Sequence, residues 1–451
     1  MFSLIFEQLV GLSAAMERPR LTRRDVVWPD VPGKIQAVTG MRRAGKTSFL
    51  FQTMSDFAAR SQKSIPAEGQ LYVNFEDERL RELDGAQLGE LVEVFYRRVP
   101  QRRGKQECLL CLDEIQLVPG WESFVRRLMD TEKVRVFVSG SSSRMLSREV
   151  ASSLRGRGME TVVWPFSFRE YLRHRFPDRT VKEAFWTPGE VSWLEAQFDD
   201  YLSQGGFPET VGLSPMHRRP ILQGYVDACL FRDIVERHQV TNVEALRRLV
   251  RQLLASPGSL FSVHKFWNDL KSQGFPVAKE TLHDYLAHLQ DAFLLLAIPL
   301  ETSSERQRQV NPRKVYPCDP GLIPIFDRSG KGNTGHALET AVAIELKRRG
   351  AELGYARTED DHEVDFSAIF ADGSRALIQV AANVSDPDTL ARELLPLQPK
   401  AKFLSHHTKS SERLLLTGTM HSAVTAQKSA PPHVNVLPAW AWMLKTGSTP
   451  G

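Results

Sequence analysis

Gly40-Met41-Arg42-Arg43-Ala44-Gly45-Lys46-Thr47 is the stretch that decides the fold of this chain. It matches the spacing G-x-x-x-x-G-K-[ST], follows the apolar run 35–39 and precedes a helix-forming segment that begins at Ser48. The two glycines allow a tight turn, which directs successive N–H groups and the start of the helix toward a phosphate chain. The alternative is a glycine-bearing turn beside a lysine, which the flanking strand and helix disfavour. The sequence therefore predicts a nucleoside triphosphate site over residues 40–48.

A second motif supports this prediction. The apolar strand 108–112 ends in Asp113-Glu114, as a central strand does when its carboxyl end lies beside a bound nucleotide. A strand end wetted by solvent would also explain the two acids, but their position after the phosphate loop favours the first interpretation. We expect Lys46 to bind the β- and γ-phosphates, Thr47 and Asp113 to hold Mg²⁺, and Glu114 to polarise the attacking water. The predicted cofactors are ATP and Mg²⁺.

Composition limits the class of protein. With 451 residues the chain can form about three domains of about 100–200 residues each. Hydrophobic residues make up 42% and charged residues 25%, which is ordinary for a globular protein. The net charge of +4 is too small for nucleic-acid binding over the whole surface, although a local basic patch stays possible. Four cysteines and no apolar run of about 18 residues favour a cytoplasmic protein without membrane association.

Residues 30–170 alternate five expected strands with helices, which predicts an α/β unit with a parallel sheet. The fourth strand, 134–138, leads into Ser139-Gly-Ser-Ser-Ser143, which would either sense the γ-phosphate or form an ordinary turn. The fifth strand, 161–164, ends at Pro165. The basic leader with Arg18, Arg20, Arg23 and Arg24 would either cover the adenine ring or lie in solvent.

Arg155 and Arg157 lie shortly before the fifth strand. A guanidinium group there would stabilise transition-state charge in a neighbouring subunit's site, and Arg157 is the favoured candidate. An ordinary surface arginine is the alternative. The catalytic set predicted from sequence is therefore Lys46, Glu114 and Arg157, the last acting within a possible homo-oligomer.

The second half of the chain predicts further modules. Residues 171–240 have a helical pattern, and 241–330 show three helices and two β-prone runs, as in a winged helix. The expected third helix carries Lys279 and His283 but also Glu280 and Asp284, so DNA binding and a structural or protein-docking role both stay open. A polar tip between the β-prone runs is expected to bear Arg306, Arg308, Arg313 and Lys314.

The combination of motifs resembles a group of bacterial and archaeal AAA+-like ATPases with a C-terminal domain of unknown function. The motifs that carry the resemblance are 39–47, 112–116, 139–142, 154–157 with 165–168, 205–208, 232–234, and Leu338-Glu339 with 363–366. The resemblance implies an ATPase core, a winged helix and a C-terminal domain similar to PD-(D/E)xK nucleases. In that nuclease pattern Glu339, Asp365 and an acid two residues before a lysine hold a divalent metal, but this chain has Gln379-Val-Ala381 at the last pair. Nuclease cleavage is therefore not expected, because an amide and a methyl group replace a carboxylate and an ammonium.

The predicted fold is an α/β P-loop NTPase core followed by helical, winged-helix and restriction-endonuclease-like α/β parts. The predicted domains span 1–170, 171–240, 241–330 and 331–451. The leading interpretation is an Mg²⁺-dependent ATPase that converts nucleotide state into docking of the C-terminal modules on DNA or a protein partner. The alternatives are an ATP-gated metal-dependent nuclease and a nucleotide-switched DNA-binding regulator.

Overall fold

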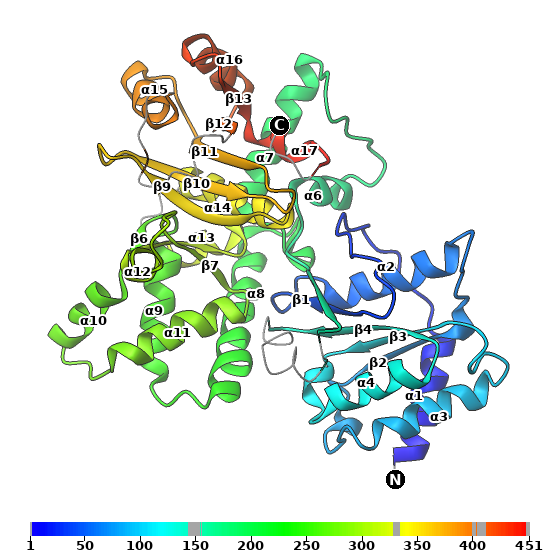
Figure 1. The fold of residues 1–451 in the computed structure, drawn as a ribbon. Coiled ribbons are helices and arrows are strands. Elements are labelled where there is room, and N and C mark those ends of the chain that lie inside the picture. Colours follow the sequence, from blue (N-terminus) through cyan, green and yellow to red (C-terminus); the bar gives the residue numbers. More distant parts are fainter. Residues whose placement is uncertain are drawn as a thin grey trace. The chain divides into compact units, whose positions relative to one another are not determined.

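The computed structural model describes residues 2–142, 154, 156–327, 334–398, 403 and 412–447. The chain divides into two compact units, which are described separately (Figure 1). The first unit comprises residues 1–163 with 291–293, and the second comprises 164–290 and 294–451.

The first unit is built on a parallel five-stranded sheet. Its strands are β1 (Ile35–Thr39), β2 (Gln70–Asn74), β3 (Cys108–Asp113), β4 (Val134–Gly140) and β5 (Gly158–Val162). Their order across the sheet is β2-β3-β4-β1-β5, and every neighbouring pair is parallel. The register sets Asn74 beside Asp113 and Thr39 beside Gly140, so the strands end at a common carboxyl edge. The predicted parallel core is confirmed, although β5 begins earlier than expected.

Helices cover both faces of this sheet, because successive side chains of a strand point to opposite sides. The helices are α1 (Phe2–Ala15), α2 (Lys46–Ala59), α3 (Leu88–Arg98) and α4 (Trp121–Thr131). Val38 packs into an apolar cluster with Phe49 and Leu50 of α2. Ile35 and Ala37 belong to the cluster that contains the buried side chains of α1, α3 and α4. The predicted nucleotide-binding motifs therefore lie at the carboxyl edge of a sheet held between α2 and three other helices (Figure 1).

The second unit begins with helices, as the sequence predicts. They are α6 (Phe168–Arg175), α7 (Pro188–Gln204), α8 (Pro215–Ala228) and the π-helix η6 (Cys229–Glu236). A capping box formed by Ser167 and Glu170 starts α6, and a second one formed by Thr187 and Glu190 starts α7.

The Gly205-Gly206-Phe207-Pro208 motif has a packing role. Gly206 N donates to Asp319 Oδ2 at 2.7 Å, and Gly321 N donates to Asp319 Oδ1 at 2.9 Å. A Cβ on Gly206 would lie 2.2 Å from Phe166 O, and one on Gly205 would lie 1.8 Å from Asp319 Oδ1. Only glycine lets these backbones approach so closely. Burial raises the pKa of Asp319 to about 7, against the two N–H donors that favour its charged form.

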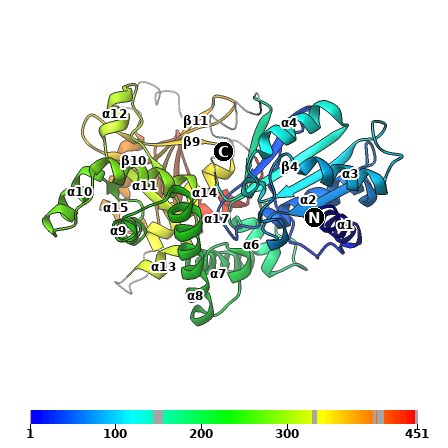
Figure 2. The same ribbon diagram turned by 90° about the horizontal axis from the view of Figure 1, so that it is seen from below.

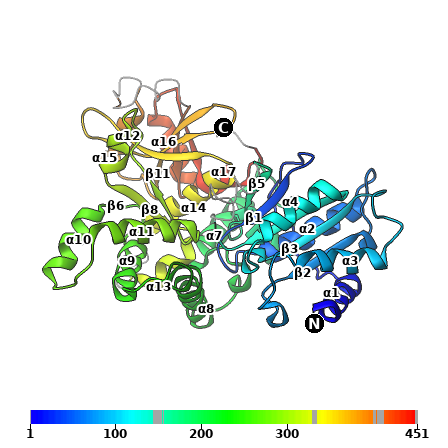
Figure 3. The same ribbon diagram turned by 60° about the horizontal axis from the view of Figure 1, so that its bottom comes forward.

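Three helices and a small antiparallel sheet follow. The elements are α9 (Val243–Ala255), β6 (Leu260–Phe261), α10 (Val263–Ser272), α11 (Lys279–Asp291), β7 (Leu295–Ile298), α12 (Glu305–Val310), β8 (Arg313–Pro317) and α13 (Ile323–Phe326). Strand β8 pairs antiparallel with both β6 and β7. Helices α9, α10 and α11 lie side by side (Figures 2 and 3). Ser262 caps α10, its side chain accepting from Lys265 N.

The prediction of a polar tip between the two β-prone runs is partly wrong. Residues 305–310 form α12, and Arg308 pairs with Glu352 at 2.8 Å. Lys314 is only 3% exposed, because β8 carries it into contact with acids of the C-terminal sheet. The sequence pattern could not reveal this burial, since the acidic partners lie about fifty residues further along the chain.

The C-terminal part has a five-stranded sheet of order β13-β12-β11-β10-β9. Its elements are α14 (Thr334–Arg348), β9 (Glu352–Arg357), β10 (Glu363–Ile369), β11 (Arg375–Ala381), α15 (Pro387–Leu394), β12 (Glu412–Thr417), α16 (Met420–Ser429), β13 (Val434–Pro438) and α17 (Ala439–Leu444). Strand β10 is antiparallel to its neighbours, whereas β11, β12 and β13 are parallel. Buried residues of α14 and α17 share one apolar cluster with the sheet, and those of α15 and α16 share another. The predicted C-terminal α/β domain is confirmed.

Two stretches of the tail rich in Ser, Thr, Lys and Pro, 407–411 and 425–433, are predicted as loops from their composition. The Ser- and Thr-rich stretch near 425–433 is not a loop throughout, since α16 continues to Ser429 and buries Ala423 and Ala426. The predicted loop 407–411 lies outside the described residues. Among the described helices, none combines the length and apolar character needed to span a bilayer.

Candidate functional site

The loop between β1 and α2 has the backbone form that its glycines allow. The φ angles of Gly40, Arg43 and Gly45 are 141°, 64° and 102°. A Cβ on Gly40 would lie 2.2 Å from Val163 O, so no larger residue fits there. Lys46 Nζ donates to Gly40 O at 3.1 Å and to Met41 O at 3.4 Å, which closes the loop on itself. The loop is therefore already curled at the start of α2.

Asp113 joins this loop to the end of β3. Its Oδ2 accepts from Thr47 Oγ1 at 2.7 Å and from Tyr72 OH at 2.9 Å, and its Oδ1 accepts from Ser139 Oγ. Burial raises the pKa of Asp113, while the hydrogen bonds from Ser139 and Thr47 favour the charged carboxylate. The Asp113 carboxylate thus contacts the Thr47 hydroxyl, and these are the two groups predicted to hold Mg²⁺ together.

Glu114 lies on the other side of the same strand end. It has a left-handed backbone with φ 54°, and its N–H donates to Ser139 Oγ at 3.1 Å. Its Oε1 lies 3.6 Å from Lys46 Nζ, and its Oε2 accepts from Gln116 Nε2 at 2.5 Å. The structure therefore brings together four residues predicted from sequence, namely Lys46, Thr47, Asp113 and Glu114.

The residues present fit a nucleoside triphosphate with a divalent cation. The curled loop and the first turn of α2 offer N–H groups to an anion, and the Lys46 ammonium is 6% exposed beside them. Thr47 and Asp113 offer the hydroxyl and carboxylate oxygens that a hard cation takes. Met41, Arg42, Ala44 and Ser48, which the motif also includes, belong to this loop and helix start, and Arg42 pairs with Glu76 at 3.0 Å.

Sequence reasoning missed two side chains that support the site. Tyr72 of β2 donates to Asp113, and burial raises the pKa of its hydroxyl, so it stays a donor. Arg24 donates to Ala44 O at 2.8 Å and is only 4% exposed, with its N–H bound to Gln52 Oε1 at 2.7 Å. The prediction that the leader lies in solvent is therefore wrong for Arg24, whose guanidinium is buried against the phosphate loop at Ala44. The one available signal was the position of Arg24 at the end of a basic cluster.

The leader is also fixed by an aromatic residue. The Trp28 ring lies 5.6 Å from Phe57 and 5.0 Å from Phe137, centroid to centroid. This packing uses the face of the sheet that α2 covers. The alternative that the leader covers an adenine ring stays a prediction.

Arg157 does not join this group of residues. Its carbonyl accepts from Ile35 N at 2.8 Å, and its guanidinium pairs with Asp130 at 2.5 Å. Ile35 starts β1 whereas the phosphate loop follows Thr39, so about 16 Å of strand separates the two ends. Arg155 and Ser143 lie outside the described residues, while Ser139 contacts the Asp113 carboxylate and the backbone N–H of Glu114.

Comparisons with known proteins agree with this geometry. Residues 32–172 match an AAA domain family, and residues 195–329 match a domain of unknown function, DUF8612. The uncharacterized protein MJ1544 of Methanocaldococcus jannaschii is 30% identical over 449 residues, which cover 98% of this chain and 95% of that protein. An uncharacterized protein of Haemophilus influenzae is 28% identical over 85% of this chain and 91% of its own length.

Solved structures show more distant similarity. The Walker-type ATPase PABY2304 of Pyrococcus abyssi is 14% identical, with a TM-score of 0.38 over 71% of this chain and 94% of that chain. The Aeropyrum pernix ORC1 protein, solved in complex with DNA, is 15% identical, with a TM-score of 0.31 over 72% and 90% of the two chains. The extended match to the methanogen protein establishes the relationship: this chain belongs to the family of MJ1544, with a P-loop fold in its first unit and a match to an AAA domain family over residues 32–172.

Proposed function

We propose that this protein is an Mg²⁺-dependent ATPase whose nucleotide state controls docking of its C-terminal modules on DNA. The observation that carries the ATPase part is the 2.7 Å hydrogen bond from Thr47 to Asp113, with Lys46 and Glu114 3.6 Å apart beside it. These four side chains come from two segments of the chain, yet they converge at one edge of the sheet. A turn with a chance lysine would not require this convergence.

The four residues divide the work of hydrolysis. Lys46 and the loop N–H groups bind the β- and γ-phosphates and stabilise the charge that develops on them. Glu114 accepts a hydrogen bond from the attacking water and orients it in line with the γ-phosphate. When bound, Mg²⁺ would be held by Thr47 and Asp113 and would neutralise phosphate charge. Ser139 keeps both acids in place through its hydroxyl group.

Arg157 is proposed to act on the site of a neighbouring subunit. Its place at the opposite edge of the sheet from the phosphate loop supports action in trans, because its own site lies about 16 Å of strand away. In the free chain Asp130 holds the guanidinium. Assembly would have to replace this exposed ion pair, which is worth about 1 kcal/mol or less.

This proposal predicts assembly-dependent turnover. ATP hydrolysis per subunit should rise with protein concentration, in parallel with the mass measured in a non-hydrolysable analogue. Arg157→Ala should lower kcat by about 10²-fold without weakening nucleotide binding, because it removes one charged donor to the transition state. Arg103→Ala is the matched control, since Arg103 is also exposed and paired, with Glu93 and Glu132. Equal rates in Arg157→Ala and the parent would exclude the trans role.

Docking on DNA is proposed to use residues 243–317, which have the helix and strand order of a winged helix. A cavity of about 190 Å³ lies between the start of α10, the start of α11 and the start of β8. Lys279, His283, Arg313 and His264 line it, and no acidic residue does so among the described residues. Burial, and then the charges of Lys279 and Arg313, lower the pKa of His283, while Glu280 and Asp284 act in the opposite direction. Such a cleft suits a DNA phosphate.

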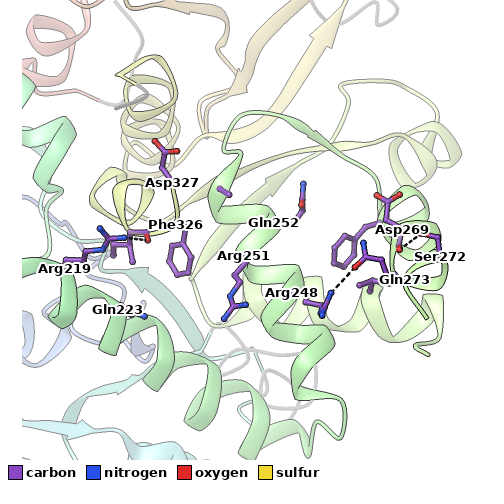
Figure 4. Close-up of a pocket in the computed structure, with 14 residues that line it drawn as sticks. Arg219, Gln223, Arg248, Arg251, Gln252, Asp269, Ser272, Gln273, Phe326 and Asp327 are labelled. Carbon is purple, nitrogen blue, oxygen red and sulfur yellow. Dashed lines mark hydrogen bonds between the residues drawn. The ribbon is translucent and has the colours of Figure 1, made fainter. Parts of the chain in front are cut away.

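A larger hollow on the same unit is a weaker candidate. It has a volume of about 950 Å³ and is lined by Arg219, Arg248 and Arg251 together with Asp269 and Asp327 (Figure 4). Arg248 already pairs with Glu244 at 3.1 Å and donates to Gln273 at 3.0 Å. Because Asp269 and Asp327 offset much of the positive charge of the larger hollow, we assign DNA docking to the smaller cleft.

The docking proposal is tested by the salt dependence of DNA binding. Lys279→Ala combined with Arg313→Ala should lower affinity for duplex DNA by about tenfold and make the slope of log K against log salt shallower by about 2. Lys271→Ala is the control, because Lys271 lies at the far end of α10 over Trp267. An unchanged slope in the double variant would move the contact elsewhere. A parent chain that binds no DNA would favour a protein partner.

A further inference from the structure

A buried charge cluster in the second unit lies where the nuclease resemblance implies a metal. Lys314 Nζ of β8 is 2.8 Å from Asp365 Oδ1 and 2.7 Å from Glu363 Oε1, both on β10. Glu339 of α14 accepts from Tyr316 OH at 3.1 Å. Lys314, Asp365 and Tyr316 are 3%, 7% and 0% exposed. The ammonium is therefore enclosed among the acids that a nuclease would use to hold its cation.

The other groups around Asp365 do not fit a metal. Its Oδ2 accepts from Val380 N at 2.9 Å, so both of its oxygens are occupied by protein donors. Gln379 Oε1 accepts from Asp365 N at 3.2 Å, and its Nε2 donates to Glu393 at 2.6 Å. Over the described ranges, no group of three or more His, Cys, Asp or Glu side chains is arranged to hold a metal ion.

Protein groups already occupy the acids of the cluster. Lys314 Nζ pairs with Asp365 and Glu363, and Arg357 Nε lies 3.9 Å from Glu363 Oε2. Glu339 accepts from Tyr316 OH. A cation from solution would therefore have to displace the buried ammonium in order to reach Asp365.

We propose that the Lys314 ammonium stands in the place of a metal ion, so that the C-terminal domain holds no divalent cation and cleaves no nucleic acid. The lysine is supplied by β8, outside the sheet that contains its acidic partners. The ion pair therefore also fastens the three-helix segment to the C-terminal sheet. Removing one partner of such a buried pair leaves the other charge uncompensated in the interior.

The test is binding of Mn²⁺ to the full chain without nucleotide, measured by electron paramagnetic resonance titration. The parent and Asp365→Asn should bind Mn²⁺ equally, because the metal position is already filled. Lys314→Ala should gain a site at least about tenfold tighter than any in the parent, since it removes a repelling charge and opens space. Lys314→Ala with Asp365→Asn should lose that site again. Thr47 and Asp113 are intact in every variant, so metal bound there is common to all.

Two further measurements guard against an unfolded variant. The comparison of the parent with Asp365→Asn does not depend on Lys314→Ala, and Mn²⁺ binding that requires Asp365 in the parent would overturn the proposal. Lys314→Met removes the charge but keeps the volume, so it should stay without a Mn²⁺ site. Mn²⁺ should raise the Tm of Lys314→Ala but not that of Lys314→Met. A folded Lys314→Ala that gains no site would also overturn the proposal.

Discussion

A Lys46→Ala variant is expected to lose ATP turnover, with kcat/KM lowered by about 10⁴-fold. The buried ammonium lies at the start of α2 beside the loop N–H groups, and Lys46 is the one lysine of residues 40–47. The substitution also frees Gly40 O and Met41 O, which Lys46 holds at 3.1 and 3.4 Å. Phosphate release and titration with a fluorescent nucleotide analogue would measure both losses.

The control for this variant is another lysine next to the same strand. Lys34→Ala removes a lysine that precedes β1 and donates to Gly156 O at 2.8 Å, at the opposite end of β1 from the loop. Turnover and nucleotide affinity should be close to those of the parent. Full activity in Lys46→Ala, or equal losses in both variants, would contradict the assignment of the site.

Glu114→Gln should separate binding from chemistry. We expect kcat to fall by about 10³-fold, because the amide cannot accept the proton of the attacking water. Nucleotide affinity should stay close to that of the parent or increase, since the variant removes a negative charge beside the phosphates. The amide has nearly the same shape, so the hydrogen bond from Glu114 N to Ser139 Oγ is kept. Single-turnover hydrolysis beside equilibrium binding would report the two effects independently.

Glu122→Gln provides the matched control, because it removes an acid from the first turn of α4 without touching the loop. Parent-like turnover in Glu114→Gln would mean that another group orients the water. A large loss of nucleotide affinity would instead mean that Glu114 positions Lys46 through their 3.6 Å ion pair.

The two motifs of the candidate site could be recognised in the sequence because each is local. Gly40 to Thr47 has the backbone requirements of a phosphate loop within eight residues, and the apolar strand before Asp113 has its own composition signal. The pairing of Thr47 with Asp113 then follows from parallel strands that end at a common edge. The positions of Tyr72 and Arg24 could not be predicted, since each depends on packing between segments distant in sequence.

The C-terminal part was harder to predict for a related reason. Strand β11 has a clear apolar run and β10 alternates polar and apolar residues, whereas β9 contains Gly354 and a charged residue at each end. Lys314 was expected at a polar tip, because a lysine in a β-prone run is usually exposed. Its acidic partners, Glu363 and Asp365, are on a strand that the sequence does not connect with β8. Only the folded chain shows that the lysine is buried.

The hydrogen bond from Arg24 to Ala44 O shows that the folded first unit includes residues that precede the family match. The family match starts at residue 32, yet Arg24 supports the loop from behind and α1 packs on α3. A fragment trimmed to residue 32 would leave a loop carbonyl without its donor and expose the apolar side of α3 to water. Domain boundaries drawn from similarity alone would therefore cut through the folding unit, and an inactive fragment made in that way would say nothing about the full chain.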